Sequence, residues 1–209
     1  MSSEMMAVRA GAISAAARPT VVFLHGRGGS ESDADLLRRS FGNSELVAFR
    51  GRLEAGAGYA WFRNTSPGIA DQESLRGEVL AFEQVLDAHD PNVKPWLCGF
   101  SNGAAMAAAL ILSRPGRYRG GLLLSGPIVD AEPWPESRLR GLSVLMVYGA
   151  SDRMIPRELL QKSSDYLANQ SGADAVLRVV AGGHEISAAK LRVASEWFAR
   201  QNHTRPPPA

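Results

Sequence analysis

The chain has 209 residues, of which 45% are hydrophobic and 21% are charged, and these values favour one globular domain over a disordered or fibrous chain. The 23 basic and 21 acidic residues leave a net charge of +2, which is too small to indicate a nucleic-acid partner. No apolar run approaches the roughly 20 residues of a membrane span, and the single cysteine, Cys98, cannot form an internal disulfide. We therefore expect a cytoplasmic protein without a membrane span.

The two ends of the chain differ in composition from its middle. Residues 1–18 are small and alanine-rich, but charged residues interrupt them, so they lack the continuous apolar region of a signal peptide. We expect a flexible arm over residues 1–18, one folded domain over residues 19–202, and a disordered proline-rich tail over residues 203–209.

Strand and helix patterns alternate along the folded part. Short apolar runs predict six strands, at residues 20–24, 46–49, 96–98, 121–125, 143–148 and 176–180. Helical spacing predicts helices at residues 33–41, 71–89, 104–112, 156–169 and 187–200. Residues 50–69 contain four glycines and one proline and predict a long loop, a feature that is usually functional. The alternation predicts a doubly wound, mostly parallel α/β sheet, with its ligand crevice at the carboxyl ends of the strands.

One serine lies between a predicted strand and a predicted helix. The segment Gly99-Phe100-Ser101-Asn102-Gly103 joins the apolar run 96–98 to the alanine-rich run 104–112. Small flanking residues allow a strained turn that lifts a hydroxyl above the edge of the sheet. In this context the Gly-x-Ser-x-Gly pattern predicts that Ser101 is a nucleophile.

Two further residues complete a possible catalytic triad. Asp152 and His184 follow later strands, and the order Ser, Asp, His along the chain is that of α/β-hydrolases. His184 would take the proton from Ser101, and Asp152 would orient the imidazole and stabilise the imidazolium. Asp130 and Asp165 are the alternatives to Asp152 in the third role.

An oxyanion needs preset donors near the nucleophile. The backbone N–H groups of Asn102 and of Arg27, in the glycine loop after the first strand, are the expected oxyanion hole. We expect Trp61 and Phe62 to bind substrate as walls of the acyl pocket, with a place in the core as the alternative. His25 is interpreted as a structural residue that hydrogen-bonds the loop.

Several other residues invite a functional interpretation. The side chains of Arg27, Arg50 and Arg63 are candidates for recognising an anionic substrate, although solvent-exposed arginines are the commoner case. Arg114, Arg117 and Arg119 predict a solvent-exposed turn, and Cys98 is interpreted as a small buried hydrophobic residue. The four histidines lack metal-ligand spacing and no phosphate-binding loop is present, so no cofactor is implied.

Taken together, five motifs resemble one known family. They are His25-Gly26-Arg27-Gly28-Gly29, Tyr59-Ala60-Trp61-Phe62, Gly99-Phe100-Ser101-Asn102-Gly103, Tyr148-Gly149-Ala150-Ser151-Asp152 and Gly183-His184-Glu185-Ile186-Ser187. In this order they resemble the small carboxylesterase, phospholipase and acyl-thioesterase family of α/β-hydrolases. The resemblance implies a compact α/β-hydrolase without a lid domain.

The resemblance also implies an activity. It indicates a serine hydrolase that cleaves small soluble carboxylic esters through an acyl-enzyme and needs no cofactor. Arg27, Asn102 and Ala104 depart from residues common in the family, which weakens inference from its thioesterase-like members. The alternatives are an acyl thioesterase or lysophospholipase with the same triad, and a non-catalytic small-molecule receptor on the same fold.

Overall fold

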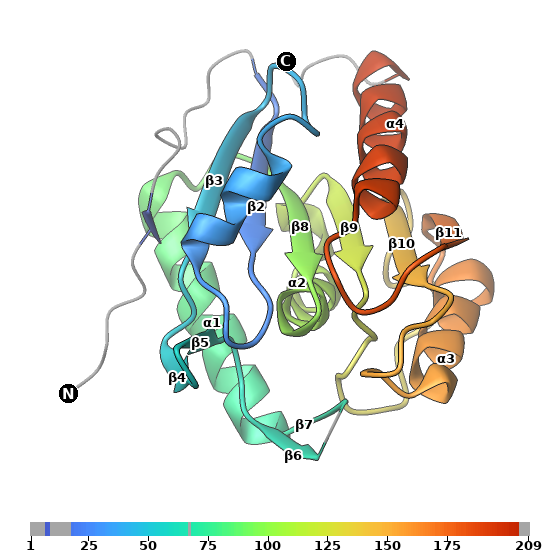
Figure 1. The fold of residues 1–209 in the computed structure, drawn as a ribbon. Coiled ribbons are helices and arrows are strands. Elements are labelled where there is room, and N and C mark those ends of the chain that lie inside the picture. Colours follow the sequence, from blue (N-terminus) through green and yellow to red (C-terminus); the bar gives the residue numbers. More distant parts are fainter. Residues whose placement is uncertain (1–6, 9–17, 67, 205–209) are drawn as a thin grey trace.

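A mixed sheet with helices on both faces forms the centre of the protein (Figure 1). The computed structural model describes residues 7–8, 18–66 and 68–204. Six strands run parallel to one another: β2 (Thr20–Leu24), β3 (Glu45–Phe49), β8 (Trp96–Phe100), β9 (Gly120–Leu124), β10 (Ser143–Gly149) and β11 (Asp174–Val180). The order in the sheet is β1-β3-β2-β8-β9-β10-β11. This confirms the predicted parallel α/β sheet of six strands.

Four α-helices cover the sheet. They are α1 (Gln72–His89), α2 (Asn102–Ser113), α3 (Arg157–Asn169) and α4 (Ala188–Thr204), with two 3-10 helices, η1 (Glu31–Leu37) and η2 (Pro115–Arg117). Successive residues of a strand point to opposite faces. Val22 of β2 accordingly belongs to the core cluster that contains residues of α1, α2 and α3, whereas Val21 belongs to the cluster that contains residues of η1 and α4.

Two predicted segments differ from what is observed. The helix expected at residues 33–41 is the 3-10 helix η1, which begins earlier, after a capping box of Ser30 and Asp33, and ends at Leu37. The long loop at residues 50–69 contains two small hairpins: β4 (Leu53–Ala55) with β5 (Gly58–Ala60), and β6 (Asn64–Ser66) with β7 (Ile69–Ala70).

The chain ends are described only in part. Within the arm expected to be flexible, β1 (Ala7–Val8) pairs antiparallel with β3. At the other end, α4 continues to Thr204, two residues into the expected tail. Residues 1–6, 9–17 and 205–209 lie outside the described part, so the flexibility of arm and tail stays a prediction.

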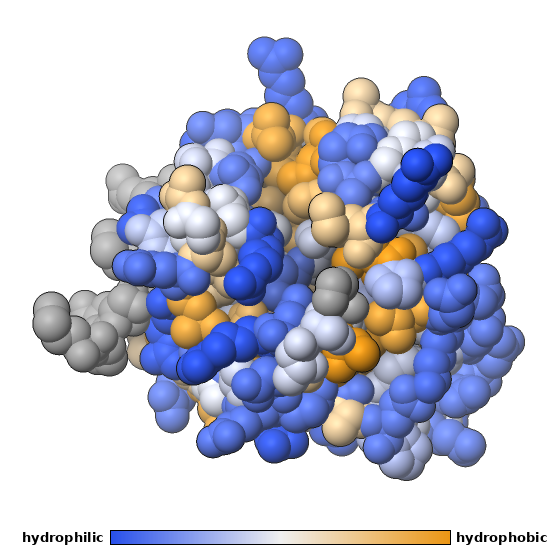
Figure 2. All heavy atoms as spheres, turned by 60° about the horizontal axis from the view of Figure 1, so that its bottom comes forward, coloured by the Kyte–Doolittle hydropathy of each residue, from blue (hydrophilic) through white to orange (hydrophobic). Residues whose placement is uncertain are grey.

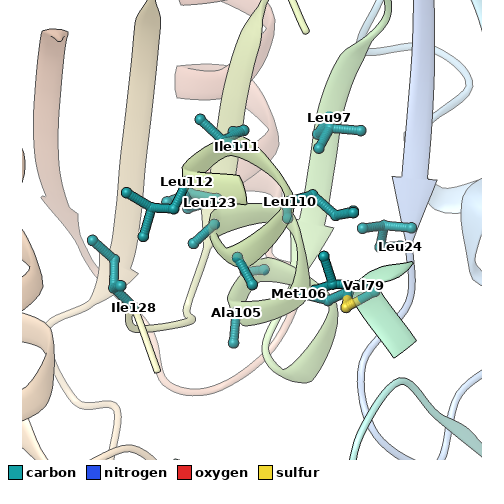
Figure 3. Close-up of a cluster of buried hydrophobic side chains, with 14 of the residues drawn as sticks. Leu24, Val79, Leu97, Ala105, Met106, Leu110, Ile111, Leu112, Leu123 and Ile128 are labelled. Atoms are coloured by element: carbon teal, nitrogen blue, oxygen red, sulfur yellow. The ribbon is translucent and has the colours of Figure 1, made fainter. Parts of the chain in front are cut away.

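The helix that follows Ser101 lies at the centre of the larger core (Figure 3). Every residue of α2 from Asn102 to Leu112 is buried, as expected of a helix that is apolar on all sides. Small residues on both sides let α2 and the strands approach closely. On the helix these are alanines, and on β9 Gly121 lies so near the helix that an added Cβ would be 2.4 Å from Ile111 Cδ1. Tight packing therefore fixes the position of the first turn of α2, and with it the turn at Ser101.

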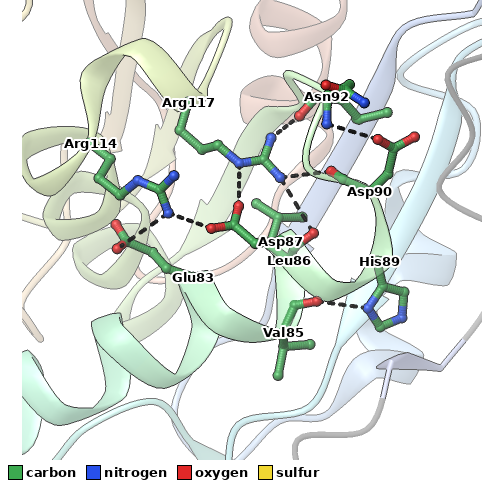
Figure 4. Close-up of polar contacts among 10 residues, drawn as sticks. Glu83, Val85, Leu86, Asp87, His89, Asp90, Asn92, Arg114 and Arg117 are labelled. Carbon is green, nitrogen blue, oxygen red and sulfur yellow. Dashed lines mark hydrogen bonds and ion pairs between the residues drawn. The ribbon is translucent and has the colours of Figure 1, made fainter.

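The turn after α2 is held by a buried arginine, which corrects one expectation (Figure 4). Arg117 is only 7% exposed. Its Nε donates to Asp87 at 2.8 Å, and its Nη atoms donate to the backbone carbonyls of Leu86, Asp90 and Val93, at and beyond the C-terminus of α1. Arg117 thus donates to carbonyls at and just beyond the helix end, so it is not the solvent-exposed residue that the sequence predicts.

A buried carboxyl in the connection between β9 and β10 gives a pH-dependent prediction. Burial raises the pKa of Asp130 to about 6, and its Oδ2 has no hydrogen-bond partner within the described chain. The folded state therefore binds more protons than the unfolded state between pH 4 and 6, so Asp130 lowers stability as pH rises through this window. We expect Asp130→Asn to be about 2 kcal/mol more stable than wild type at pH 7, and the difference to vanish near pH 4.

Urea unfolding of both proteins at several pH values measures this difference. Glu136→Gln, which changes an exposed carboxyl of the same connection, is the control and should show no such dependence. A stability difference between Asp130→Asn and wild type that does not change with pH would contradict the prediction.

Candidate active site

The strand order reverses direction between β2 and β8, and this is where a doubly wound sheet binds its ligand. From β2 the chain adds β3 on one side and then returns to place β8 on the other. The arrowheads of β2, β8 and β9 point to the same edge, at the bottom of Figure 1. The loops after β2 and β8 therefore lie side by side, which brings Arg27 and Ser101 to one edge of the sheet.

Ser101 occupies a strained turn between β8 and α2. Its φ is 53° and its ψ is −116°, a conformation that residues with a side chain rarely adopt. Its N–H donates to Leu124 O at 2.8 Å. A Cβ at Gly99 would lie 2.2 Å from Gly103 O, and a Cβ at Gly103 would lie 2.1 Å from Leu24 O. The two glycines are therefore required because backbone segments meet closely around the serine.

Three side chains from three different loops meet at this turn. His184 Nε2 lies 2.8 Å from Ser101 Oγ, and His184 Nδ1 lies 2.8 Å from Asp152 Oδ2. A neutral imidazole can donate from Nδ1 to the carboxylate and accept the hydroxyl proton at Nε2. We call these residues the candidate triad. The contact places Asp152 next to the imidazole; the alternatives Asp130 and Asp165 have no such contact.

The carboxylate of the candidate triad is itself fixed. Asp152 Oδ1 accepts hydrogen bonds from the N–H groups of Met154, at 3.0 Å, and Ile155, at 3.4 Å. Burial by itself would raise the pKa of Asp152, whose side chain is 1% exposed, but the hydrogen bond to His184 and these N–H donors outweigh it and hold the pKa below its usual value. Asp152 is therefore a carboxylate at neutral pH.

The loop after β2 is held by a neighbouring hairpin. Gly28 N–H donates to Tyr59 O at 2.8 Å, and Tyr59 N–H donates to Gly29 O at 2.9 Å. Arg27 precedes this pair and lines the same cavity as Ser101 and Asn102. Asn102 is the first residue of α2, where the helix leaves its N–H groups without internal partners. Both predicted oxyanion donors thus belong to residues beside the serine.

A tryptophan connects this loop to the turn at Ser101. Trp61 Nε1 donates to His25 O at 2.9 Å, and Trp61 N–H donates to Asn102 Oδ1 at 2.8 Å. Trp61 is fully buried, packs edge-on against Phe82, and is not among the residues that line the cavity. The expectation that Trp61 forms a wall of the acyl pocket is therefore corrected: it lies in the core. Phe62, the next residue, does line the cavity.

His25 has the structural role expected of it. Its Nε2 accepts the N–H of Gly51 at 3.0 Å, so its proton is on Nδ1, which donates to Gly26 O at 2.7 Å. Burial lowers the pKa of His25 below its usual value. Both ring nitrogens are used within the fold, and His25 is not available as a second base.

The cavity beside Ser101 has a volume of about 680 Å³. Besides the serine and His184, its lining is mostly apolar or neutral: Phe62, Asn64, Ser66, Gly68, Phe100, Asn102, Ala105, Pro127, Val129, Met154 and Ile155, with Arg27 at one side. Figure 2 shows this end of the molecule, where apolar side chains gather in patches among hydrophilic ones. The residues after Asp152 and after β9 were not predicted to line a pocket, because only the tertiary structure brings those loops to the serine.

The three arginines considered for substrate recognition have different surroundings. Arg50 forms an ion pair with Glu31, and its guanidinium lies 4.8 Å from the centre of the Tyr59 ring. Arg63 is exposed and does not line the cavity, whereas Arg27 is exposed and does. Within residues 7–8, 18–66 and 68–204, no cluster of three or more His, Cys, Asp or Glu side chains could hold a metal ion, and no helix is long and apolar enough to cross a membrane.

The indole N–H of Trp61 gives a testable prediction. Trp61→Phe leaves the buried carbonyl of His25 without its donor, so we expect the free energy of unfolding to fall by about 1–3 kcal/mol in urea titrations. Trp134→Phe is the matched control. Its indole N–H also donates to a carbonyl, that of Asp130, but the tryptophan is only partly buried and water can replace the bond. Equal losses in both variants would contradict this account.

Known proteins share this architecture. Residues 54–202 match the family described as phospholipase/carboxylesterase. The chain is 27% identical to MhqD of Bacillus subtilis, over 85% of this chain and 91% of that protein. It is 30% identical to the carboxylesterase SOBER1 of Arabidopsis thaliana, over 51% of this chain and 48% of that protein. The Bacillus cereus carboxylesterase structure has a TM-score of 0.82 at 23% identity over 94% of each chain. The Mesorhizobium loti carboxylesterase structure has a TM-score of 0.79 at 25% identity, over 94% of this chain and 99% of that chain.

The fold is therefore that of an α/β-hydrolase, and the protein is a hydrolytic enzyme. More specifically, the chain belongs to the phospholipase/carboxylesterase family.

Proposed function

We propose that this enzyme is a serine hydrolase that cleaves small carboxylic esters through an acyl-enzyme intermediate. The observation that carries the proposal is the position of the His184 imidazole, 2.8 Å from both the Ser101 hydroxyl and the Asp152 carboxylate. A serine hydroxyl is a weak nucleophile at neutral pH unless a positioned base removes its proton during attack. In the proposal, Ser101 is the nucleophile, His184 is the general base and acid, and Asp152 orients His184.

The proposed reaction has two halves. Ser101 Oγ bonds to the ester carbonyl carbon while its proton passes to His184 Nε2, and the carbonyl oxygen becomes an oxyanion. The backbone N–H groups of Arg27 and Asn102 are the proposed donors to that oxyanion, and one such donor is typically worth about 2.7–4 kcal/mol. The ester C–O bond then breaks, and His184 returns the proton to the leaving alcohol. Water repeats the sequence on the acyl-enzyme and releases the acid and Ser101.

The cavity supports small substrates with apolar acyl groups. Its volume of about 680 Å³ is in the usual range for small-ligand sites, and side chains such as Phe62, Val129 and Ile155 provide apolar contact. The similarity to SOBER1, a carboxylesterase, favours an ester over a thioester as substrate. The proposed substrate is therefore a short- or medium-chain ester.

A cytoplasmic location stays a prediction, which the single free cysteine, Cys98, supports.

A p-nitrophenyl ester series from acetate to decanoate tests the proposal. We expect kcat/KM to be highest for the shorter acyl chains, and a fluorophosphonate probe to label the protein covalently at Ser101, as located by peptide mass spectrometry. A folded protein that neither hydrolyses the series nor takes up the probe would leave the receptor alternative. A much higher kcat/KM on acyl thioesters than on the matched esters would instead identify a thioesterase.

A further inference from the structure

A fully buried lysine lies next to the loop that carries the proposed base. Lys190 is 0% exposed, although lysine is among the residues least often buried. Its Nζ donates to Gly183 O at 2.6 Å and to Glu185 O at 2.8 Å. These two carbonyls belong to the residues immediately before and after His184. The ammonium group therefore contacts the backbone on both sides of the imidazole.

The local environment of this lysine is unfavourable for a positive charge. Lys190 is the third residue of α4, and its N–H donates to Ser187 Oγ at the start of the helix. The N-terminus of a helix carries a partial positive charge, which disfavours a cation there. Burial lowers the pKa of Lys190, while Glu185 and Asp152, the carboxylates that interact with it, act in the opposite direction. The two hydrogen bonds to the His184 loop and the two carboxylates offset the cost of burying this charge.

The same loop is connected to the loop of Asp152. Ser151 N–H donates to Gly182 O at 2.9 Å, and both oxygens of the Glu185 carboxylate lie 3.0 Å from Gly183 N. A Cβ at Gly149 would lie 2.3 Å from Gly182 O, so the two loops are in close contact. These contacts limit how far the His184 loop can move on the side of β10 and β11, and Lys190 limits it on the side of α4.

We propose that Lys190 is a positioning residue for the base: its buried ammonium group holds the carbonyls of Gly183 and Glu185 and thereby keeps the His184 imidazole between Ser101 and Asp152. The inference rests on the proposed function, because it assigns Lys190 a role through His184. Lys190 is not among the residues that line the cavity.

The test compares kcat and KM of three variants on p-nitrophenyl acetate. Lys190→Met keeps most of the side-chain volume but removes both hydrogen bonds, and a displaced imidazole should lower kcat by about 100-fold while KM stays within about twofold. Lys190→Gln keeps one N–H donor group and should give an intermediate kcat. Lys162→Met, which removes an exposed lysine of α3, should behave as wild type.

A destabilised control separates positioning from loss of stability. Phe198→Leu truncates a buried side chain of the same helix that packs against Phe41 and Trp96, away from the His184 loop. It should lower the unfolding temperature without changing kcat. A folded Lys190→Met protein with kcat within twofold of wild type, or with no greater loss of kcat than Phe198→Leu, would overturn the inference. If Lys190→Met does not fold, Lys190→Gln is judged by the same comparison.

A spectroscopic measurement separates this inference from the proposed function. The His184 Nδ1 proton, hydrogen-bonded to Asp152, should give a downfield proton resonance in wild type and in Ser101→Ala. It should be lost or broadened in Lys190→Met and kept in Phe198→Leu. An unchanged resonance in Lys190→Met would overturn the positioning role whether or not the protein hydrolyses esters, whereas inactive wild type with the resonance intact would count against the proposed function alone.

Discussion

Replacing Ser101 with alanine is expected to lower kcat for p-nitrophenyl acetate by about 10⁶-fold, the loss seen when the nucleophile of a working triad is removed. Alanine has the same Cβ as serine, so the strained φ of 53° and the packing of Gly99 and Gly103 are not changed. The variant should therefore fold as wild type does, and circular dichroism and the unfolding temperature check this. The initial burst of p-nitrophenolate, which reports acyl-enzyme formation, should also disappear.

Ser125→Ala is the matched control for that experiment. Ser125 is also a buried serine with positive φ, 52°, at the end of the neighbouring strand β9, and it is not among the lining residues of the cavity. Its loss should leave kcat within about twofold of wild type. Equal activity of wild type and Ser101→Ala would show that Ser101 is not the nucleophile.

Asp152→Asn is expected to lower kcat by about 10⁴-fold because it enforces the wrong tautomer of His184. The N–H groups of Met154 and Ile155 donate to Asp152 Oδ1, so the amide oxygen of the asparagine must face them. Its NH₂ group then points at His184 Nδ1 and donates to it. The imidazole proton moves to Nε2, which can no longer accept the proton of Ser101.

Steady-state kinetics on the same ester and the rate of fluorophosphonate labelling both measure this effect. Asp165→Asn changes an exposed carboxylate that is hydrogen-bonded to Gln161, and it should leave both rates unaltered. If Asp152→Asn is folded and retains more than about a tenth of wild-type kcat, Asp152 does not orient the base and the proposed mechanism is wrong in this part.

Several features of the fold could be predicted because they depend on local patterns. Five of the six parallel strands are short, largely buried apolar runs, whereas the edge strand β11 is partly exposed, and the alternation with helices determines the class of sheet. The start of α1 follows from Asp71, whose side chain accepts from the N–H groups of Glu73 and Ser74. The helix expected at residues 33–41 is wrong in type and bounds, because this segment is the 3-10 helix η1 from Glu31 to Leu37.

The burial of two side chains, Arg117 and Trp61, could not be predicted, and the physical cause is the same for both. The sequence predicts a solvent-exposed turn for Arg117 and either a pocket wall or a core position for Trp61, and both residues are buried among groups far away in sequence. Arg117 satisfies carbonyls at the end of α1, and Trp61 donates to the backbone of His25 while its own backbone N–H donates to Asn102. A sequence shows that such donors exist; it does not show which distant acceptors they will meet.

The local chemistry of the candidate site can be predicted from short segments of the sequence. The small residues around Ser101 permit a strained turn, the glycines after β2 permit a close backbone approach, and the order of Ser101, Asp152 and His184 places each after a different strand. These are properties of short segments, and parallel strands bring their carboxyl ends to one edge of the sheet whatever the details of packing.

Which of these groups touch depends on the tertiary structure. It forms the 2.8 Å contacts of His184 with Ser101 and Asp152 and the lining of the cavity, and these contacts join loops that are far apart in the chain. Such contacts require the elements to be placed to within a few tenths of an ångström. The packing of the core around α2 and on the two faces of the sheet determines this placement.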